Sequence, residues 1–468
     1  MSVKLWQARL PEAALLPEFE EINASIGVDG RLFHEEIEVN AAWAQALEEA
    51  GLLTESERRR LVGALRRVEL EIASGELKLT PDQEDIHTAV ENRLVERLGP
   101  LGGKLRAGRS RNDLVVSDLK LYLKRALAGI LGRIDAAQEA AVARAEAHPR
   151  AVMPGYTHLR QAQPLLFAHV LMALVAGLER DRGRIGDALT RLDRLPLGSG
   201  ALAGTGLAID REALARRLGF AAPTENSLDA VSDRDFVLEV ASALAILLSR
   251  LSRLAEDFLL WSTQEFGFVE IDASLLTGSS LMPQKRNPDA LELVRARAGR
   301  AAGQVAGLLA TFKGLPGGYN KDLQEDKAPL FDLLDSTRLC LAIVARCLET
   351  LGVREERMRA GLDRSTLATD LAEHLVEKGV PFREAHAAVA SLVSHCEKRG
   401  LPLHLARLND LRRSSPAFDE KALLLLDPDS SIGRRGATGG TAPTSVRAQV
   451  RAARRRLRRR AAHSGAAH

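Results

Sequence analysis

The sequence contains few aromatic residues, few cysteines and no long apolar run. Phe, Trp and Tyr make up 4% of the 468 residues, which argues against recognition of single-stranded nucleic acid by base stacking. Three cysteines in a chain of this length do not suggest a disulfide framework, so we expect reduced, buried thiols. No apolar run approaches the roughly 18 residues that a membrane helix needs, and no signal-peptide core opens the chain. We therefore expect a cytoplasmic protein without a membrane partner.

Metal-type Cys/His spacing, a glycine-rich phosphate loop and internal repeats are also absent from the sequence. The formal net charge is +3, and 46% of the residues are hydrophobic, as in ordinary soluble proteins. The tail from Arg451 to Arg460 holds seven arginines. Without aromatic residues or a binding fold beside it, this tail is better explained as a solvated terminal helix than as a nucleic-acid site.

Helical periodicity dominates the chain and predicts an all-α fold. Helices are expected at 41–50 and 54–74, where Thr54 and Glu57 form a capping box. Apolar residues at steps of three and four then form a long seam: Val237, Val240, Leu244, Leu247, Leu251, Leu254, Phe258 and Trp261. This spacing is typical of helices packed at a shallow angle, and no stretch sustains the alternation of a strand. We expect an N-terminal helical domain at 1–110, a central long-helix bundle at 111–360 and a C-terminal helical domain at 361–468, with the bundle extended by oligomerisation.

The segment from Thr277 to Glu292 carries the strongest functional signal. Gly278, two serines and Pro283 indicate a loop. Asn287 is a good N-cap before Pro288 at the first position of a helix. Since a helix N-terminus attracts anions and Lys285 adds a positive charge, the segment suits a carboxylate held beside two hydroxyl groups. It therefore favours chemistry on an acidic substrate.

Other polar segments interrupt the helices, and each lies at the end of a predicted helix. Gly108–Asp113 precedes a long helix and offers donors for a carboxylate. A turn between two helices is expected at 154–164, and further polar segments lie at 229–235 and 317–327. A lone histidine beside a turn, such as His158, is more often structural than catalytic. The coincidence of several such segments favours a functional site.

The loop resembles the signature Gly-Ser-Ser-x-x-Pro-x-Lys-x-Asn of the fumarase/aspartase superfamily, matched by Gly278, Ser279, Ser280, Pro283, Lys285 and Asn287. Over nearly its full length the chain resembles argininosuccinate lyases. The segments that carry this resemblance are Asn23–Ile26 with Asp29, Asp85–Thr88, Gly108–Asp113, Gly155–Leu159, Val231–Phe236, Gly278–Lys285, Tyr319–Lys327 and Gly439–Pro443.

The resemblance implies a homotetramer whose long helices form a shared central bundle, with each active site built from three subunits. It implies reversible cleavage of argininosuccinate to arginine and fumarate, the last step of arginine biosynthesis, without a cofactor or metal. Ser279 is implied as the base and His158 as the proton donor to the leaving guanidine, with Glu292 as its charge partner and Lys285 in the catalytic group. The opposite assignment, with His158 as base and Ser279 as acid, stays open.

The resemblance also implies a set of substrate-binding residues. Lys285 and Asn287 would grip the succinyl carboxylates. Further donors would be Ser110, Asn112 and Thr157. The rest of the adduct, including its arginine end, would be held by Ser25, Tyr319, Gln324 and Lys327, with assistance from Arg111, Asp29 and Arg234.

The chain departs from the family pattern at three places. Gln7-Ala8 stands where the family has Gly-Gly, Glu36-Ile-Glu-Val-Asn-Ala-Ala42 stands for Asp-Ile-x-Gly-Ser-x-Ala, and Leu114 stands for Gln. Lost glycines remove backbone freedom, and we expect all three changes to flank the arginine side of the site. They leave two alternatives: a related lyase that releases fumarate from another succinyl adduct, or a non-catalytic structural protein like the lens crystallins.

Overall fold

The structure is a computed structural model, and it describes residues 15–465. It is mostly helical, which confirms the all-α prediction. The helices are α1 (Pro17–Asn23), α2 (Ile26–Asp29), α3 (Phe33–Glu49), α4 (Glu55–Ala73), α5 (Ile86–Leu98), α6 (Pro100–Lys104), α7 (Arg111–Ala147), α8 (Phe167–Leu192), α9 (Arg211–Arg217), α10 (Ser227–Ser232), α11 (Asp235–Ser262), α12 (Asp289–Phe312), α13 (Lys327–Thr350), α14 (Glu355–Ala360), α15 (Ala368–Glu377), α16 (Phe382–Lys398), α17 (Leu408–Ser414), α18 (Lys421–Leu424), α19 (Pro428–Arg434) and α20 (Pro443–Gly465). None of the helices described is long and apolar enough to cross a lipid bilayer.

Short strands pair at four places. β1 (Val152–Thr157) and β2 (Arg160–Leu166) form an antiparallel hairpin with a bulge at Gly155 and Tyr156. The other pairs are two-residue bridges: β3 (Arg194–Leu195) with β4 (Ala222–Pro223), β5 (Val269–Glu270) with β8 (Gly352–Val353), and β6 (Thr277–Gly278) with β7 (Arg286–Asn287). The hairpin corrects the expectation of a simple turn at 154–164. A Cβ at Gly155 would lie 2.9 Å from the Gln163 carbonyl oxygen, so the bulge needs glycine there.

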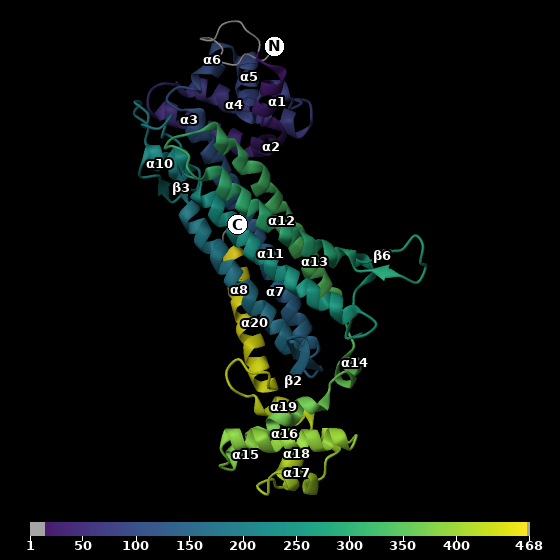
Figure 1. Cartoon of the computed structure of the whole chain (residues 1–468). Coiled ribbons are helices and arrows are strands. Elements are labelled where there is room, and N and C mark those ends of the chain that lie inside the picture. Colours follow the sequence, from purple (N-terminus) through teal and green to yellow (C-terminus); the bar gives the residue numbers. More distant parts are fainter. Residues whose placement is uncertain (1–14, 466–468) are drawn as a thin grey trace. The chain divides into compact units, whose positions relative to one another are not determined.

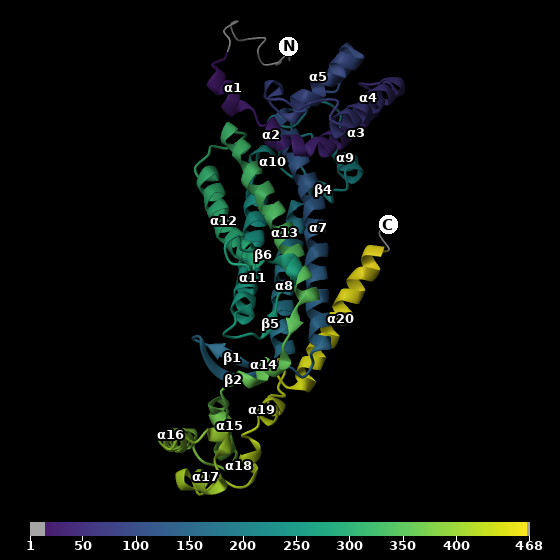
Figure 2. The same ribbon diagram turned by 90° about the vertical axis from the view of Figure 1, so that its right-hand side faces the viewer.

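The chain divides into two compact units. Within the described residues, unit 1 comprises 15–131, 182–246 and 299–337, and unit 2 comprises 132–181, 247–298 and 338–465. Each unit contains a part of α7, α8, α11, α12 and α13, and within each unit these helical segments lie side by side (Figures 1 and 2). The three sequence regions predicted above are not tested by this division and stay a prediction.

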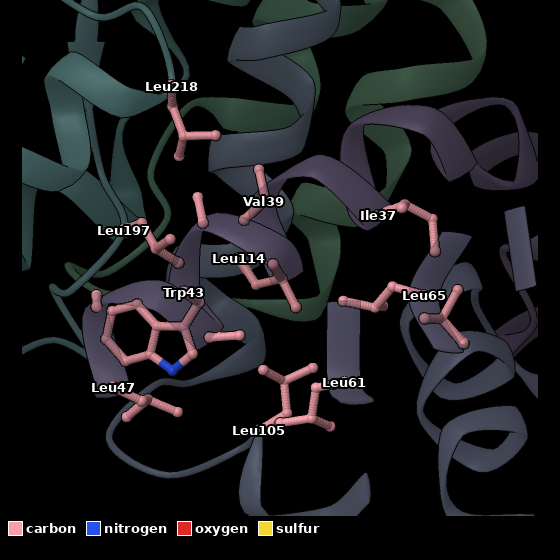
Figure 3. Packing of buried hydrophobic residues seen from close by; sticks show 14 of the residues in the cluster. Ile37, Val39, Trp43, Leu47, Leu61, Leu65, Leu105, Leu114, Leu197 and Leu218 are labelled. Carbon is pink, nitrogen blue, oxygen red and sulfur yellow. The ribbon is translucent and has the colours of Figure 1, made fainter. Parts of the chain in front are cut away.

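Unit 1 contains a hydrophobic core around α3, α4, α5 and the start of α7 (Figure 3). Trp43 is fully buried in it, and its indole Nε1–H donates to the Ala107 carbonyl oxygen at 3.1 Å. The capping box of Thr54 and Glu57 is present at the start of α4, as predicted. This core fixes the N-terminal ends of α5 and α7, where several candidate site residues lie.

Unit 2 contains the second half of the predicted seam on α11, and Leu247, Leu251 and Phe258 are fully buried there. The residues of the seam in unit 1 are buried as well, so the helical prediction is confirmed. The arginine-rich helix α20 pairs within the unit, since Arg454 binds Glu146 at 2.7 Å and Arg460 binds Asp135 at 2.8 Å. The three cysteines are buried and form no disulfide with one another, as expected.

Candidate active site

In unit 1, the starts of α5 and α7 are joined by Arg111. Its guanidinium lies 2.9 Å from the Asp85 carboxylate and donates to Thr88 Oγ1 at 2.8 Å. Asp85 is itself the N-cap of α5 and accepts from the Thr88 N–H at 2.8 Å. Arg111 is therefore held in a fixed orientation at the N-terminal ends of both helices.

Ser25 and Asp29 lie against the same segment. Ser25 Oγ donates to Asp29 Oδ2 at 2.5 Å, and Asp29 Oδ1 accepts from the Ile86 N–H at 3.0 Å. Burial raises the pKa of the Asp29 carboxyl, although His87 and the hydrogen bond from Ser25 lower it. Asp29 therefore anchors the start of α5 and orients the Ser25 hydroxyl.

Ser110 immediately precedes α7, and Asn112 lies in its first turn. Asp113 accepts from the Ser110 N–H at 3.0 Å, and its other oxygen accepts from the N–H groups of Gly198 and Gly200 at 2.9 and 2.8 Å. Asn112 donates to the Ala201 carbonyl at 3.1 Å. These contacts make the loop before α7 rigid, which a carboxylate-binding helix start requires.

Arg234 and Lys327 share one buried carboxylate. Asp326 accepts from Arg234 Nε at 2.6 Å and from Lys327 Nζ at 2.7 Å, and all three residues are at most 3% exposed. Burial alone would raise the pKa of Asp326, but the two cations outweigh it and lower that pKa. Arg234 Nη2 is buried without a hydrogen-bond partner, so a donor is left over at this position.

Tyr319 and Gln324 lie on the segment that leads into α13. Burial raises the pKa of Tyr319 to about 12, and Arg234 and Arg111 oppose that rise. The phenol thus keeps its proton and faces the same charged groups. Gln324 donates to the Asn23 carbonyl at 3.2 Å, which ties this segment to the residue two places before Ser25. Unit 1 therefore brings together Ser25, Asp29, Ser110, Arg111, Asn112, Arg234, Tyr319, Gln324 and Lys327.

In unit 2, β6 and β7 close the base of the loop that carries Ser279. Ser279 Oγ accepts from the backbone N–H of Met282 at 3.0 Å and of Leu281 at 3.3 Å. Two amide donors on one hydroxyl oxygen would stabilise negative charge there. The Lys285 side chain on the same loop is exposed.

The helix after this loop begins one residue later than predicted. Asn287 pairs with Thr277 in the β6–β7 bridge, and α12 starts at Asp289. The Pro288 carbonyl oxygen accepts from the N–H groups of Leu291 and Glu292 at 3.0 and 3.3 Å. Asn287 is thus held by strand pairing rather than by the helix, and Thr277 Oγ1 donates to the Asp289 carboxylate.

Thr157 and His158 lie at the tip of the β1–β2 hairpin. His158 and Leu159 both adopt positive φ, at 54° and 58°, a conformation that costs L-residues roughly 1–2 kcal/mol each. Both His158 and Glu292 are exposed, and Glu292 lies 3.7 Å from Arg295 in a weak ion pair. Within the described residues of one chain, no hydrogen bond or ion pair joins Ser279, His158 and Glu292.

The sequence did not point to one further cluster, which is buried behind the start of α5. It comprises Glu36, Asn40, His87, Arg109 and Asp118. His87 Nδ1 lies 2.7 Å from Glu36 Oε2 and 3.6 Å from Asp118 Oδ2. The segment Asp85–Thr88, which contains His87, is one of those that carry the family resemblance. Nothing in the sequence links this segment to residues 36 or 118.

Donor atoms of Glu36, His87 and Asp118 all lie within 4.8 Å of one another. Arg109 acts electrostatically on both carboxyl groups, and burial together with Glu36 raises the pKa of Asp118 well above its usual value. We therefore assign Glu36 and His87 to a hydrogen-bonded pair rather than to a metal ion.

Those departures from the family pattern that lie within the described residues are close to this buried cluster or in the core of unit 1. Val39 is fully buried and Leu114 is 5% exposed, and both belong to the core of unit 1. Asn40 contacts Glu36 and Arg109. Gln7 and Ala8 lie outside the described residues.

The chain is similar to known proteins over nearly its whole length. Residues 16–303 match the family model described as Lyase, and residues 365–433 match the model of the argininosuccinate lyase C-terminal region. The chain is 48% identical over 462 residues to an argininosuccinate lyase of Thermus thermophilus, covering 98% of this chain and 99% of the relative. It is 47% identical over 453 residues to that of Roseiflexus sp., covering 96% and 99%.

Among solved structures, an EDDS lyase in complex with formate matches with a TM-score of 0.85 and 31% identity, covering 97% of this chain and 93% of the other. A class II fumarase from Schistosoma mansoni matches with a TM-score of 0.73 and 18% identity, covering 85% and 89%, which shows the shared fold alone.

Proposed function

The chain belongs to the argininosuccinate lyase family of the fumarase/aspartase superfamily, and from this premise we propose how its residues divide the reaction between them. The protein is a C–N lyase that cleaves argininosuccinate reversibly to arginine and fumarate, as the last step of arginine biosynthesis. Identity to argininosuccinate lyases is well above that to the EDDS lyase. This favours argininosuccinate over another succinyl adduct, and an enzyme over a structural protein.

The reaction removes a proton from the carbon beside a carboxylate and then expels a guanidinium nitrogen. Charge builds up on that carboxylate in the intermediate, so fixed donors around it lower the barrier. Ser279 is the base in this proposal. The single observation that carries the assignment is the pair of backbone N–H groups on its Oγ, because an alkoxide needs such donors to persist.

His158 donates the proton to the leaving guanidine, with Glu292 as its charge partner across a subunit boundary. Support comes from the strained turn that presents His158 at the hairpin tip, since strain of this kind collects at functional sites. Lys285 and Asn287 bind the succinyl carboxylates, aided by Ser110, Asn112 and Thr157. The rest of the adduct lies against Ser25, Tyr319, Gln324 and Lys327, and Arg111, Asp29 and Arg234 hold these groups in place.

The working form is a homotetramer in the cytoplasm whose active sites are shared between subunits. Large apolar side chains stay exposed on the long helices of the single chain: Leu293 is 59% exposed and Leu309 52% on α12, and Leu339 is 44% exposed on α13. Exposed apolar side chains along one helix favour burial against another chain. The superfamily neighbours support oligomers of this kind.

Fumarate release, followed by ultraviolet absorbance, tests the assignment of Ser279. Ser279→Ala should lower kcat by about 100- to 10,000-fold, the range of a lost general base. Ser280→Ala is the matched control, because Ser280 is the exposed neighbour in the same loop, and it should keep kcat within threefold. Equal activity of the two variants would overturn the role given to Ser279.

Mixing two inactive variants tests the shared site. Ser279→Ala and His158→Asn tetramers, dissociated and reassembled together, should regain part of the parent activity if different chains supply the two groups. No recovery, in mixtures of one tagged and one untagged variant whose hybrid tetramers are shown by native mass spectrometry, would count against the shared site.

A further inference from the structure

A buried polar cluster lies directly behind the two helix starts that carry proposed substrate-binding residues. It joins α3, α5 and α7 within unit 1. Glu36 is 2% exposed, His87 5% and Asp118 0%. Ionisable groups are rarely placed in an interior unless their contacts are specific, because apolar residues of similar size would often be as stable.

Glu36 is the centre of this cluster. Its Oε2 accepts from His87 Nδ1 at 2.7 Å, and its Oε1 accepts from Asn40 Nδ2 at 2.6 Å. Asn40 Oδ1 in turn accepts from Arg109 Nη2 at 2.5 Å. One carboxylate therefore connects the first turn of α5, through His87, with the loop before α7, through Asn40 and Arg109.

Arg111 also connects these two segments, because it binds Asp85 and donates to Thr88. In the sequence, His87 lies between Asp85 and Thr88, and Arg109 lies two residues before Arg111. Asp29 holds the same turn of α5 through the Ile86 N–H. A shift of His87 or Arg109 would thus displace Arg111 and the neighbouring Ser110 and Asn112, which are the groups proposed to position the bound substrate.

We propose that Glu36 and Asn40 are positioning residues of the lyase, which hold the Asp85–Thr88 turn and the Arg109–Asn112 loop in register around the substrate. The inference rests on the proposed function, because it assumes that Ser110, Arg111 and Asn112 serve the bound adduct. It adds two residues that contact neither the substrate nor the reacting atoms.

The charges around Glu36 fit this role. Burial would raise the pKa of Glu36, but His87, Asp118 and Arg109 together outweigh burial and lower that pKa to about 2. Burial lowers the pKa of His87, but Glu36, Asp85 and Asp29 together outweigh burial and raise that pKa. Burial and the charge of Glu36 raise the pKa of Asp118 well above its usual value. These shifts favour the charged forms of Glu36 and His87 and the protonated form of Asp118. Arg109 belongs to the cluster, and the charged groups outside it that act on it are Asp29, Glu35, Asp85, Glu91 and Asp113.

A small cavity beside the cluster supports the same conclusion. It is lined by Glu36, Asn40, His87, Arg109 and Arg111 among others, and its volume of about 30 Å³ has room for one or two water molecules. His87 Nε2 and Arg109 Nη1 are buried without a hydrogen-bond partner, and both residues line this cavity. No group of the described residues therefore holds these two nitrogen atoms. The positions of both residues therefore depend on their bonds to Glu36 and Asn40.

The test compares Glu36→Gln, Asn40→Ala and the double variant with Glu69→Gln as the matched control. Glu69 also binds a histidine of α3, His34, at 2.7 Å, but that pair is exposed. We expect the KM for argininosuccinate to rise at least tenfold in both single variants while kcat falls less than threefold. The double variant should be no more than twofold worse than the poorer single variant, because both changes break one connection. Glu69→Gln should stay within twofold of the parent.

Circular dichroism separates positioning from loss of folding. A fall in kcat that tracks the folded fraction, with KM unchanged, would overturn the proposal, and so would single effects that multiply in the double variant. If Glu36→Gln does not fold, Asn40→Ala decides alone, and an unchanged KM there overturns the proposal. A parent protein without fumarate release would instead remove the proposed function, which keeps the two failures distinct.

Discussion

Replacing Asp326 by Asn would test whether one buried carboxylate organises the Arg234–Lys327 side of the site. Asp326 is completely buried and accepts from both cations at 2.6 and 2.7 Å. Asn has nearly the same shape but carries no charge, and one of its two polar atoms is a donor. The variant would leave Arg234 and Lys327, each 3% exposed, as buried cations without a counter-charge.

Loss of one partner from a buried ion pair costs about 3–5 kcal/mol, so the free energy of unfolding should fall by that amount. Asp335→Asn is the control. Asp335 binds Arg31 at a similar 2.7 Å, but these side chains are 42% and 37% exposed. Solvent screens such a pair, so its loss should cost only about 0–1 kcal/mol.

Denaturant unfolding at one fixed protein concentration would measure both values, and initial rates would give KM. Asp326→Asn should also raise the KM for argininosuccinate, because Lys327 loses the acceptor that holds it. An Asp326→Asn protein whose stability lies within 1 kcal/mol of Asp335→Asn would refute the reasoning that this carboxylate balances two buried cations.

Three further predictions concern single features of the fold. Thr54→Ala removes the capping box of α4 and should lower the free energy of unfolding by about 1 kcal/mol, with unchanged kinetics in the fumarate assay. Glu36 has a pKa of about 2 in the folded protein, below the usual 4.5. Its stabilisation is therefore complete above pH 4.5 and is lost as the pH falls towards 2, so Glu36→Gln should show a smaller loss of stability between pH 5 and pH 3 in denaturant titrations. Leu159 has φ of 58° and is 85% exposed, so Leu159→Gly should raise the free energy of unfolding by up to about 1 kcal/mol; a lower melting temperature would contradict the strain at this turn.

Much of the fold was visible in the sequence because its helices are long and regular. The seam on α11 repeats at steps of three and four, and every one of its predicted residues is buried. The hairpin at 152–166 was missed for the opposite reason. Its strands are six and seven residues long, Pro154 lies opposite Pro164, and a bulge interrupts the alternation at Gly155. The positive φ angles of His158 and Leu159 were not predicted either, because neither residue is a glycine.

The candidate site shows a similar limit. The polar segments at helix ends were found, and the structure groups those of unit 1 around Arg111 and Asp326. The cluster of Glu36, His87 and Asp118 was not found, because charged residues on a helix normally indicate its solvent face. These three residues are far apart in the sequence, and only packing of α3, α5 and α7 brings them into contact.

The distribution of exposed groups gives the proposed tetramer a chemical role. Thr157, His158, Lys285 and Glu292 are all exposed in one chain, although fixed donors stabilise a carbanion best where water is excluded. If neighbouring chains cover these groups, activity per chain should fall steeply on dilution below the dissociation constant of the tetramer. Circular dichroism should retain its helical signal there, because the cores of both units lie within one chain. Light scattering would report the oligomer at each concentration. Full activity in dissociated chains would mean that a single chain completes its own site.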